Sequence, residues 1–187
     1  MSDYVLYLRD LLETLGLTQA HVVGHSLGGW MAAELAVWYP ERVSKLVLSN
    51  AAGIRVKGAP IADLFAMNPR ETLMACFDNL AAAAPLIPAE LNNDYLVQMY
   101  KERTTLAALA WNPRFDPKLE RRLQSLRCPT LIIWGQNDRL IPPMYGATFQ
   151  SLIPGSRFIT LAGTGHMPMF EQPEAWARHI SDFFQQK

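Results

Sequence analysis

Short apolar runs alternate with stretches of helical periodicity in two parts of the chain. The runs are bounded by turn residues and are too short for buried helices, so we interpret them as strands. They are Ala20–Val23, Val43–Leu48, Pro129–Trp134 and Arg157–Leu161. Because strands that alternate with helices favour a parallel sheet with helices on both faces, we predict an α/β fold with a mostly parallel sheet of about four strands, flanked by helices.

The segments next to these runs repeat apolar residues at three- and four-residue steps, which predicts helices. Tyr4–Leu15 places its leucines on one side, as an amphipathic helix does. Leu27–Tyr39 has the same period and stops at Pro40, which cannot continue a helix. A further helix is predicted around Pro143–Leu152, and another after the last strand.

Residues 54–127 lack a convincing strand and separate two blocks of the chain. Their spacing and prolines predict three helical segments. These are 69–84, 92–110 and 117–126. The pair Arg121 and Arg122 is interpreted as a solvated face. We therefore predict one core, made by residues 1–53 and 128–187, with residues 54–127 as a helical insertion.

The composition excludes several classes of protein. Because 17 basic residues balance 17 acidic ones, neither nucleic acid nor an anionic membrane is an expected partner. No apolar stretch is long enough to span a bilayer, and the first residues lack the features of a signal peptide.

Cys76 and Cys128 stand in no metal-binding or redox spacing, so we expect a cytoplasmic protein. We expect no metal or other cofactor, because no zinc-protease or phosphate-loop motif is present.

Residues 24–28 read Gly-His-Ser-Leu-Gly and stand between a predicted strand and a predicted helix. A serine in this context occupies a sharp, strained turn that exposes its hydroxyl, so Ser26 is the candidate nucleophile. Side chains are expected to clash at the flanking positions of such a turn, which accounts for Gly24 and Gly28. The backbone N–H of Leu27, at the helix start, is expected to face a developing oxyanion.

A serine hydroxyl is a poor nucleophile unless a base removes its proton. Of the 4 histidines, His166 lies in a Gly-rich loop after a predicted strand. From such a loop a rigid scaffold often presents a catalytic base. We interpret the other three as structural residues. They are His21, His25 and His179.

The third residue expected is a carboxylate that orients the imidazole. Asp138 follows the buried run Pro129–Trp134 in a turn-rich segment, and so lies on the side of the sheet expected for Ser26. The preceding strand ends in Ser49 and Asn50 and offers no carboxylate. Position and elimination both favour Asp138.

The chain order Ser26, Asp138, His166 resembles that of the α/β-hydrolase superfamily, and of its serine esterases and lipases in particular. The resemblance extends over nearly the whole chain through three segments. They are residues 23–29, 133–138 and 165–174. It implies Ser26 as nucleophile, His166 as general base and then general acid, and Asp138 as the orienting partner. It also implies an acyl-enzyme intermediate that water hydrolyses.

The same family places a helical cap after the strand that follows the nucleophile helix, which corresponds here to residues 54–127. Apolar side chains of such a cap are expected to roof the site, although most of them simply pack the cap onto the core. Met and aromatic side chains suit a deformable apolar pocket. The candidate pocket residues are Met67, Phe77, Met99, Trp111 and, beside the histidine, Met167.

Two features depart from the family pattern. No His-Gly dipeptide is present to supply a second oxyanion donor. Loss of one donor costs about 100- to 1,000-fold in turnover, so we expect reduced activity.

Only one predicted helix precedes the nucleophile strand, so we expect the chain to be the C-terminal portion of such a hydrolase. Ala20–Val23 would then be a sheet edge, and we expect a homo-oligomer or a separately made N-terminal piece to cover it.

Three functions follow from this pattern. The first expectation is a serine hydrolase that cleaves small, largely apolar carboxylic esters. The layout is also similar to carbon–carbon bond hydrolases of the meta-cleavage-product type, although His25 and Leu27 beside the nucleophile resemble esterases and lipases more. The third alternative is a non-catalytic, truncated hydrolase that acts as a binding or assembly module.

Overall fold

The computed structural model describes residues 1–61 and 115–186. Four parallel strands form one sheet in the order β1-β2-β3-β4, so each strand lies beside its neighbour along the sequence. They are β1 (Ala20–His25), β2 (Val43–Ser49), β3 (Thr130–Gly135) and β4 (Arg157–Leu161). In the register of the sheet, Leu48 pairs with Ile132 and Ile133 pairs with Ile159. The predicted parallel α/β fold is confirmed.

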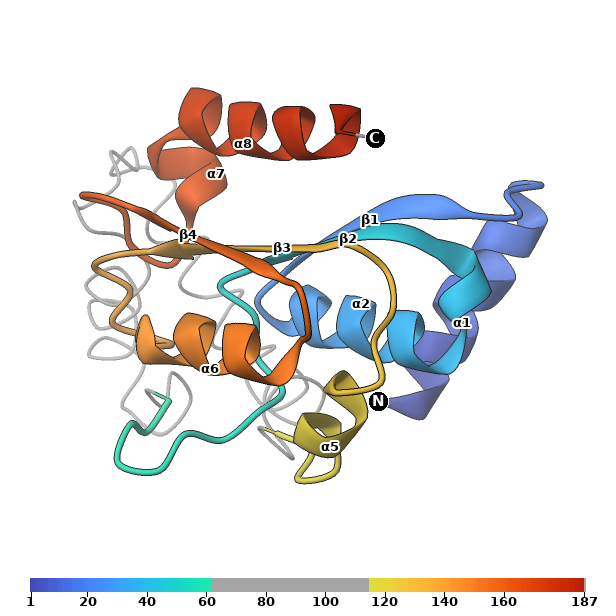
Figure 1. Ribbon diagram of the computed structural model, residues 1–187, viewed down its shortest axis with the longest axis horizontal. Coiled ribbons are helices and arrows are strands. Elements are labelled where there is room, and N and C mark those ends of the chain that lie inside the picture. The colour runs from blue at the N-terminus through green and yellow to red at the C-terminus, as the bar shows by residue number, and fades with distance from the viewer. Residues whose placement is uncertain (62–114, 187) are drawn as a thin grey trace, which may run out of the picture.

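Helices cover both faces of the sheet (Figure 1). α2 and α6 lie on one face, with α1 and α5 beside them, and α8 lies on the opposite face. The elements are α1 (Ser2–Thr14), α2 (Leu27–Trp38), the 3₁₀ turn η1 (Pro40–Arg42), α5 (Leu119–Leu123), α6 (Met144–Leu152), α7 (Pro168–Glu171) and α8 (Pro173–Gln185). The predicted helices and strands thus begin and end within a few residues of their predicted bounds, except in the insertion.

The hydrophobic core lies on both sides of β3, whose six residues are all buried. Leu131 and Ile133 contribute to the cluster beneath α8, together with Phe183. Ile132 and Trp134 contribute to the larger cluster on the other face. This alternation follows from the period of two in a strand, and it explains why the strand reads as a continuous apolar run.

The residue before the insertion lies beside a later residue of the insertion. Gly53 and Phe115 form an isolated parallel bridge. The helices predicted over 69–84 and 92–110 lie outside the described residues, and the one predicted over 117–126 is only the five-residue α5. The division into a core and a helical cap over residues 54–127 stays a prediction.

Arg122 on α5 is not on a solvated face, so that interpretation was wrong for this residue. Its guanidinium lies 2.5 Å from the carboxylate of Glu34 and 2.7 Å from that of Asp116. Glu34 is buried in α2 and also accepts a hydrogen bond from the indole of Trp30. A buried carboxylate needs such partners, and the pairing joins the end of the insertion to the helix that follows Ser26.

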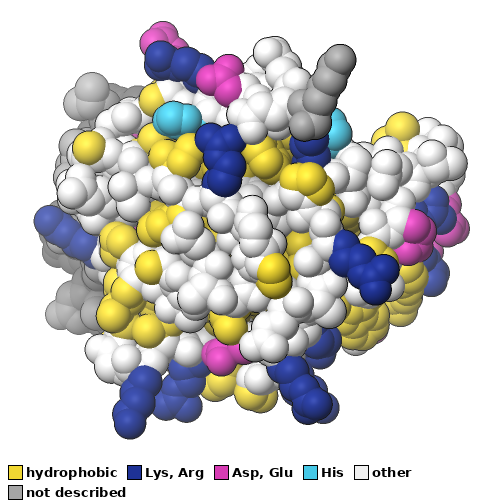
Figure 2. Space-filling model, in the orientation of Figure 1, with side chains coloured by type: hydrophobic (Ala, Val, Ile, Leu, Met, Phe, Trp, Pro, Cys, Tyr) yellow, Lys and Arg dark blue, Asp and Glu magenta, His cyan; other side chains and the backbone are white. Residues whose placement is uncertain are grey.

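β1 forms one end of the sheet within the described part of the chain. Val23 of this strand is 40% exposed and lines a groove with Trp176, Ile180 and Phe184 of α8. Figure 2 shows a further group of hydrophobic side chains over α1. The expectation that another copy or another piece covers this edge stays a prediction, and a dilute, monodisperse monomer in light scattering would count against it. No described helix is long and apolar enough to cross a membrane.

Candidate active site

Ser26 occupies a strained turn between β1 and α2. Its φ of 53° and ψ of −120° are unusual for a residue with a side chain. The turn is held at both peptide groups: the Ser26 N–H donates to Ser49 O at 3.0 Å, and the Ser26 carbonyl accepts from Gly29 N at 3.0 Å and Ala52 N at 2.9 Å. Leu27 is the first residue of α2, where backbone N–H groups have no partner within the helix. The turn therefore holds Ser26 directly before the backbone N–H of Leu27, at the start of α2.

Close packing explains two glycines of the motif, Gly24, as predicted, and Gly29, which was not predicted. A Cβ on Gly24 would collide with the carbonyl oxygen of Gly28 and lie 2.7 Å from Ala32 Cβ. A Cβ on Gly29 would lie 2.5 Å from Ala51 Cβ. A Cβ on Gly28 would meet nothing within 4 Å, so the predicted clash at this position was wrong. The tight approach of α2 to β1 and β2 is made at Gly24 and Gly29 instead.

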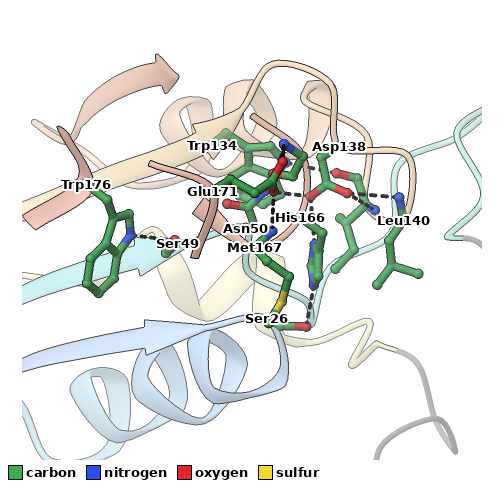
Figure 3. Close-up of polar contacts among 12 residues, drawn as sticks. Ser26, Ser49, Asn50, Trp134, Asp138, Leu140, His166, Met167, Glu171 and Trp176 are labelled. Carbon is green, nitrogen blue, oxygen red and sulfur yellow. Dashed lines mark hydrogen bonds and ion pairs between the residues drawn. The ribbon is translucent and has the colours of Figure 1, made fainter. Parts of the chain in front are cut away.

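The structure brings together the three residues that the sequence singled out, from three separate loops (Figure 3). His166 Nε2 lies 3.0 Å from Ser26 Oγ, and His166 Nδ1 lies 2.8 Å from Asp138 Oδ2. Asp138 and His166 are both buried, which shields their hydrogen bond from water. This arrangement lets the imidazole take a proton from the serine while the carboxylate fixes its orientation.

Asp138 is held by more than the histidine. Its Oδ1 accepts hydrogen bonds from the backbone N–H groups of Leu140 at 2.9 Å and Ile141 at 2.8 Å. Its Oδ2 also accepts from the side-chain amide of Asn50 at 2.6 Å. Four donors thus point at one carboxylate and fix its position beside His166. In the sequence, Asn50 stands out only as a position without a carboxylate, so this role was not predicted.

His25 lies against His166 and cannot replace it as a base. The two ring centroids are 4.8 Å apart. Burial, and then the neighbouring His166, lower the pKa of His25 to about 3. His25 is therefore uncharged near neutral pH, and its Nδ1 has no hydrogen-bond partner among the described residues. The packing agrees with its structural interpretation.

The other two histidines lie away from Ser26. His21 Nδ1 is 2.5 Å from Ser44 Oγ, and its ring stacks on Phe184 of α8. His179 lies in α8 and is half-buried. Neither makes a contact that assigns it a chemical role.

Of the predicted pocket residues, only Met167 lies in the described part of the chain. It directly follows His166, is half-buried, and extends its side chain toward Ser26 in Figure 3. The remaining candidates fall outside the described residues. They are Met67, Phe77, Met99 and Trp111. Within residues 1–61 and 115–186, no group of His, Cys, Asp and Glu side chains could hold a metal ion.

With this geometry established, the chain can be compared with known proteins. Residues 1–179 match the alpha/beta hydrolase family, and the chain belongs to that family. It is 31% identical, over 96% of its length and 67% of the relative's, to a 2-hydroxy-6-oxononadienedioate/2-hydroxy-6-oxononatrienedioate hydrolase from Paraburkholderia phymatum. It is 32% identical, over 95% of its length and 67% of the relative's, to a hydrolase of the same name from Pseudomonas putida. The chain thus spans about two thirds of the length of these relatives.

Solved structures give the same fold. A membrane phospholipase A is similar with a TM-score of 0.83 and 25% identity, over 96% of this chain and 61% of that one. A meta-cleavage product hydrolase from Pseudomonas fluorescens has a TM-score of 0.83 and 24% identity, over 98% and 71% of the two chains. At that identity the second likeness supports the fold alone.

Proposed function

We propose that this chain is a serine hydrolase that cleaves a carbon–carbon bond beside a ketone, in a substrate of the 2-hydroxy-6-oxo dienoate class. The observation that supports a serine mechanism is the chain of hydrogen bonds from Ser26 through His166 to Asp138, at 3.0 and 2.8 Å. The substrate class comes from the names of the relatives that are 31% and 32% identical.

The site residues divide the reaction between them. Ser26 Oγ forms a bond to the ketone carbon, and its proton passes to His166 Nε2. The N–H of Leu27 stabilises the resulting alkoxide, and Asp138 stabilises the imidazolium. The bond between the ketone carbon and its neighbour then breaks, its electron pair passes into the conjugated end of the leaving fragment, and His166 returns the proton to that fragment. Water, deprotonated by His166, releases the acyl group from Ser26.

Cleavage of a carbon–carbon bond needs an acceptor for the electron pair of the broken bond. In a 2-hydroxy-6-oxo dienoate, the conjugated enol end provides this acceptor once it has become a ketone. A simple ester needs no such acceptor, because an alkoxide leaves directly. The two substrate classes therefore share the serine step and differ in the leaving group.

Ester hydrolysis, the first expectation from the sequence, is the second candidate. It is supported by His25 and Leu27 beside the nucleophile and by the likeness to a phospholipase A at 25% identity. The curated relatives favour carbon–carbon cleavage over this expectation. Among the described residues we assign one oxyanion donor, the Leu27 N–H, so we keep the expectation of turnover about 100- to 1,000-fold below that of a complete oxyanion hole.

The test offers the protein both substrates under the same conditions. Loss of the conjugated absorbance of 2-hydroxy-6-oxononadienedioate measures carbon–carbon cleavage, and p-nitrophenol release from a short-chain ester measures the alternative. We expect the dienedioate to have the higher kcat/KM, and Ser26→Ala to abolish both activities. A higher kcat/KM for the ester would reject the substrate class. If neither substrate turns over in a Ser26-dependent manner, the third alternative, a binding or assembly module, is favoured.

A further inference from the structure

One carboxylate binds the backbone on both sides of His166. Glu171 accepts hydrogen bonds from the N–H of Gly165, at 3.0 Å to each of its oxygens. Its Oε1 also accepts from the N–H of Met167 at 3.1 Å. Figure 3 shows Glu171 beside the His166–Asp138 pair, with its carboxylate directed at this loop. The residue does not touch the reacting atoms, so its effect must pass through His166.

The fold returns Glu171 to this place by a short helical turn. α7 begins directly after Met167, and the N–H groups of Phe170 and Glu171 donate to the Met167 carbonyl at 2.9 and 3.0 Å. The turn folds the chain back, so that a side chain five positions after His166 faces the loop that contains it. The sequence alone does not reveal this, because a Glu in a short helix is usually solvated.

His166 needs such support because it is presented by a loop rather than by a strand or helix. Its ring must reach Ser26 and Asp138 at the same time, from a segment with irregular backbone. The Gly165 carbonyl accepts a hydrogen bond of 3.4 Å from Asn50. Asn50 and Glu171 thus both bind peptide groups next to His166.

We propose that Glu171 is a positioning residue that holds His166 in reach of both Ser26 and Asp138 by binding the N–H groups of Gly165 and Met167. Hydrogen bonds to a charged acceptor are about twice as strong as neutral ones. Without the carboxylate, both N–H groups lose their protein partner and the loop is free to shift. Displacement of a catalytic group by about 1 Å costs on the order of 100-fold in rate. The assignment rests on the proposed function, in which His166 is the base.

Kinetics of two substitutions test the role. Glu171→Ala removes both hydrogen bonds, and we expect kcat to fall about 100-fold while KM changes less than about twofold. Glu171→Gln keeps an oxygen at the position of Oε1, which alone accepts from both N–H groups at 3.0 and 3.1 Å. Its NH₂ group replaces Oε2, which also accepts from the Gly165 N–H at 3.0 Å, so we expect kcat below the wild type but about tenfold or more above Glu171→Ala. Glu174→Ala, at an exposed acidic residue three positions later, is the matched control and should leave kcat unchanged.

A spectroscopic readout tests the same role without any substrate. The proton shared by His166 Nδ1 and Asp138 should give a downfield NMR resonance, assigned by its loss in Asp138→Asn. We expect this resonance in the wild type, Glu171→Gln and Glu174→Ala, and its loss or broadening in folded Glu171→Ala. Wild-type kcat, or an unchanged resonance, in Glu171→Ala overturns the proposal. If the wild type turns over no substrate but its resonance depends on Glu171, the proposed function fails while the positioning role stands.

Discussion

Ser26 and His166 face each other at 3.0 Å, but the protein holds them by different means. The turn at Ser26 is fixed by backbone hydrogen bonds and by close packing, in which Gly24 and Gly29 leave no room for a side chain. The loop at His166 is held by hydrogen bonds that it donates to the carboxylates of Asp138 and Glu171. One catalytic residue thus depends on backbone contacts and packing and the other on side-chain carboxylates, and the two should respond differently to substitution.

The largest effect should follow removal of the charge at Asp138. Its carboxylate accepts from four donors, whereas the amide of Asp138→Asn has a single oxygen and places its NH₂ group against some of them. The histidine then loses the orientation that the reaction needs, and kcat should fall about 10⁴-fold. Steady-state kinetics measures this. A loss below about tenfold would mean that Asp138 does not orient His166.

A substitution in the tightly packed turn at Ser26 should lower the stability of the fold rather than impair a step of the reaction. In Gly24→Ala the new Cβ collides with the Gly28 carbonyl and with Ala32, so the helix must move. We expect unfolding to become about 3 kcal/mol easier, which lowers Tm by about 6–12 °C in a chain of this size. Thermal denaturation followed by circular dichroism measures the change.

Gly28→Ala is the control for that experiment, since its Cβ meets nothing within 4 Å. It lies in the first turn of α2, where alanine is the better helix former, and should be neutral or stabilise by up to about 1 kcal/mol. Equal Tm losses in both variants would contradict the packing argument.

His25 joins the two regions, because it sits beside Ser26 and packs against His166 at 4.8 Å. Its pKa of about 3 in the folded protein lies below the value of about 6.5 in an unfolded chain. Between these values the unfolded state binds more protons, so the free energy of unfolding decreases as the pH falls below about 6.5. His25→Phe keeps an aromatic ring and should reduce this slope by up to about 1.4 kcal/mol per pH unit. Urea denaturation at several pH values measures it, and an unchanged slope would contradict the neutral, buried His25.

The same contrast explains how much the sequence could predict. The strands, the turn at Ser26 and the positions of Asp138 and His166 follow from local patterns: apolar runs, glycines, and polar residues directly after strands. The supporting residues Asn50 and Glu171 do not. Asn50 donates to Asp138 because β2 lies beside β3, and that neighbourhood is a property of the sheet rather than of either segment.

The packing partners of Gly29 and Arg122 could not be predicted from local sequence patterns either. The steric requirement falls on Gly29 rather than Gly28, because it depends on where Ala51 meets the helix. Arg122 is an ion-pair partner of buried Glu34, although 88 residues separate them. In both cases the relevant contact is between segments that are distant in the sequence, and only the folded structure brings them together.

We propose that His166, oriented by Asp138, makes Ser26 a nucleophile. The most direct measurement is covalent labelling with a fluorophosphonate probe, followed by peptide mass spectrometry of the wild type and of His166→Ala. We predict a single label on Ser26 in the wild type and no comparable label in the variant. A label on another residue, or equal labelling of Ser26 without the imidazole, would contradict the account.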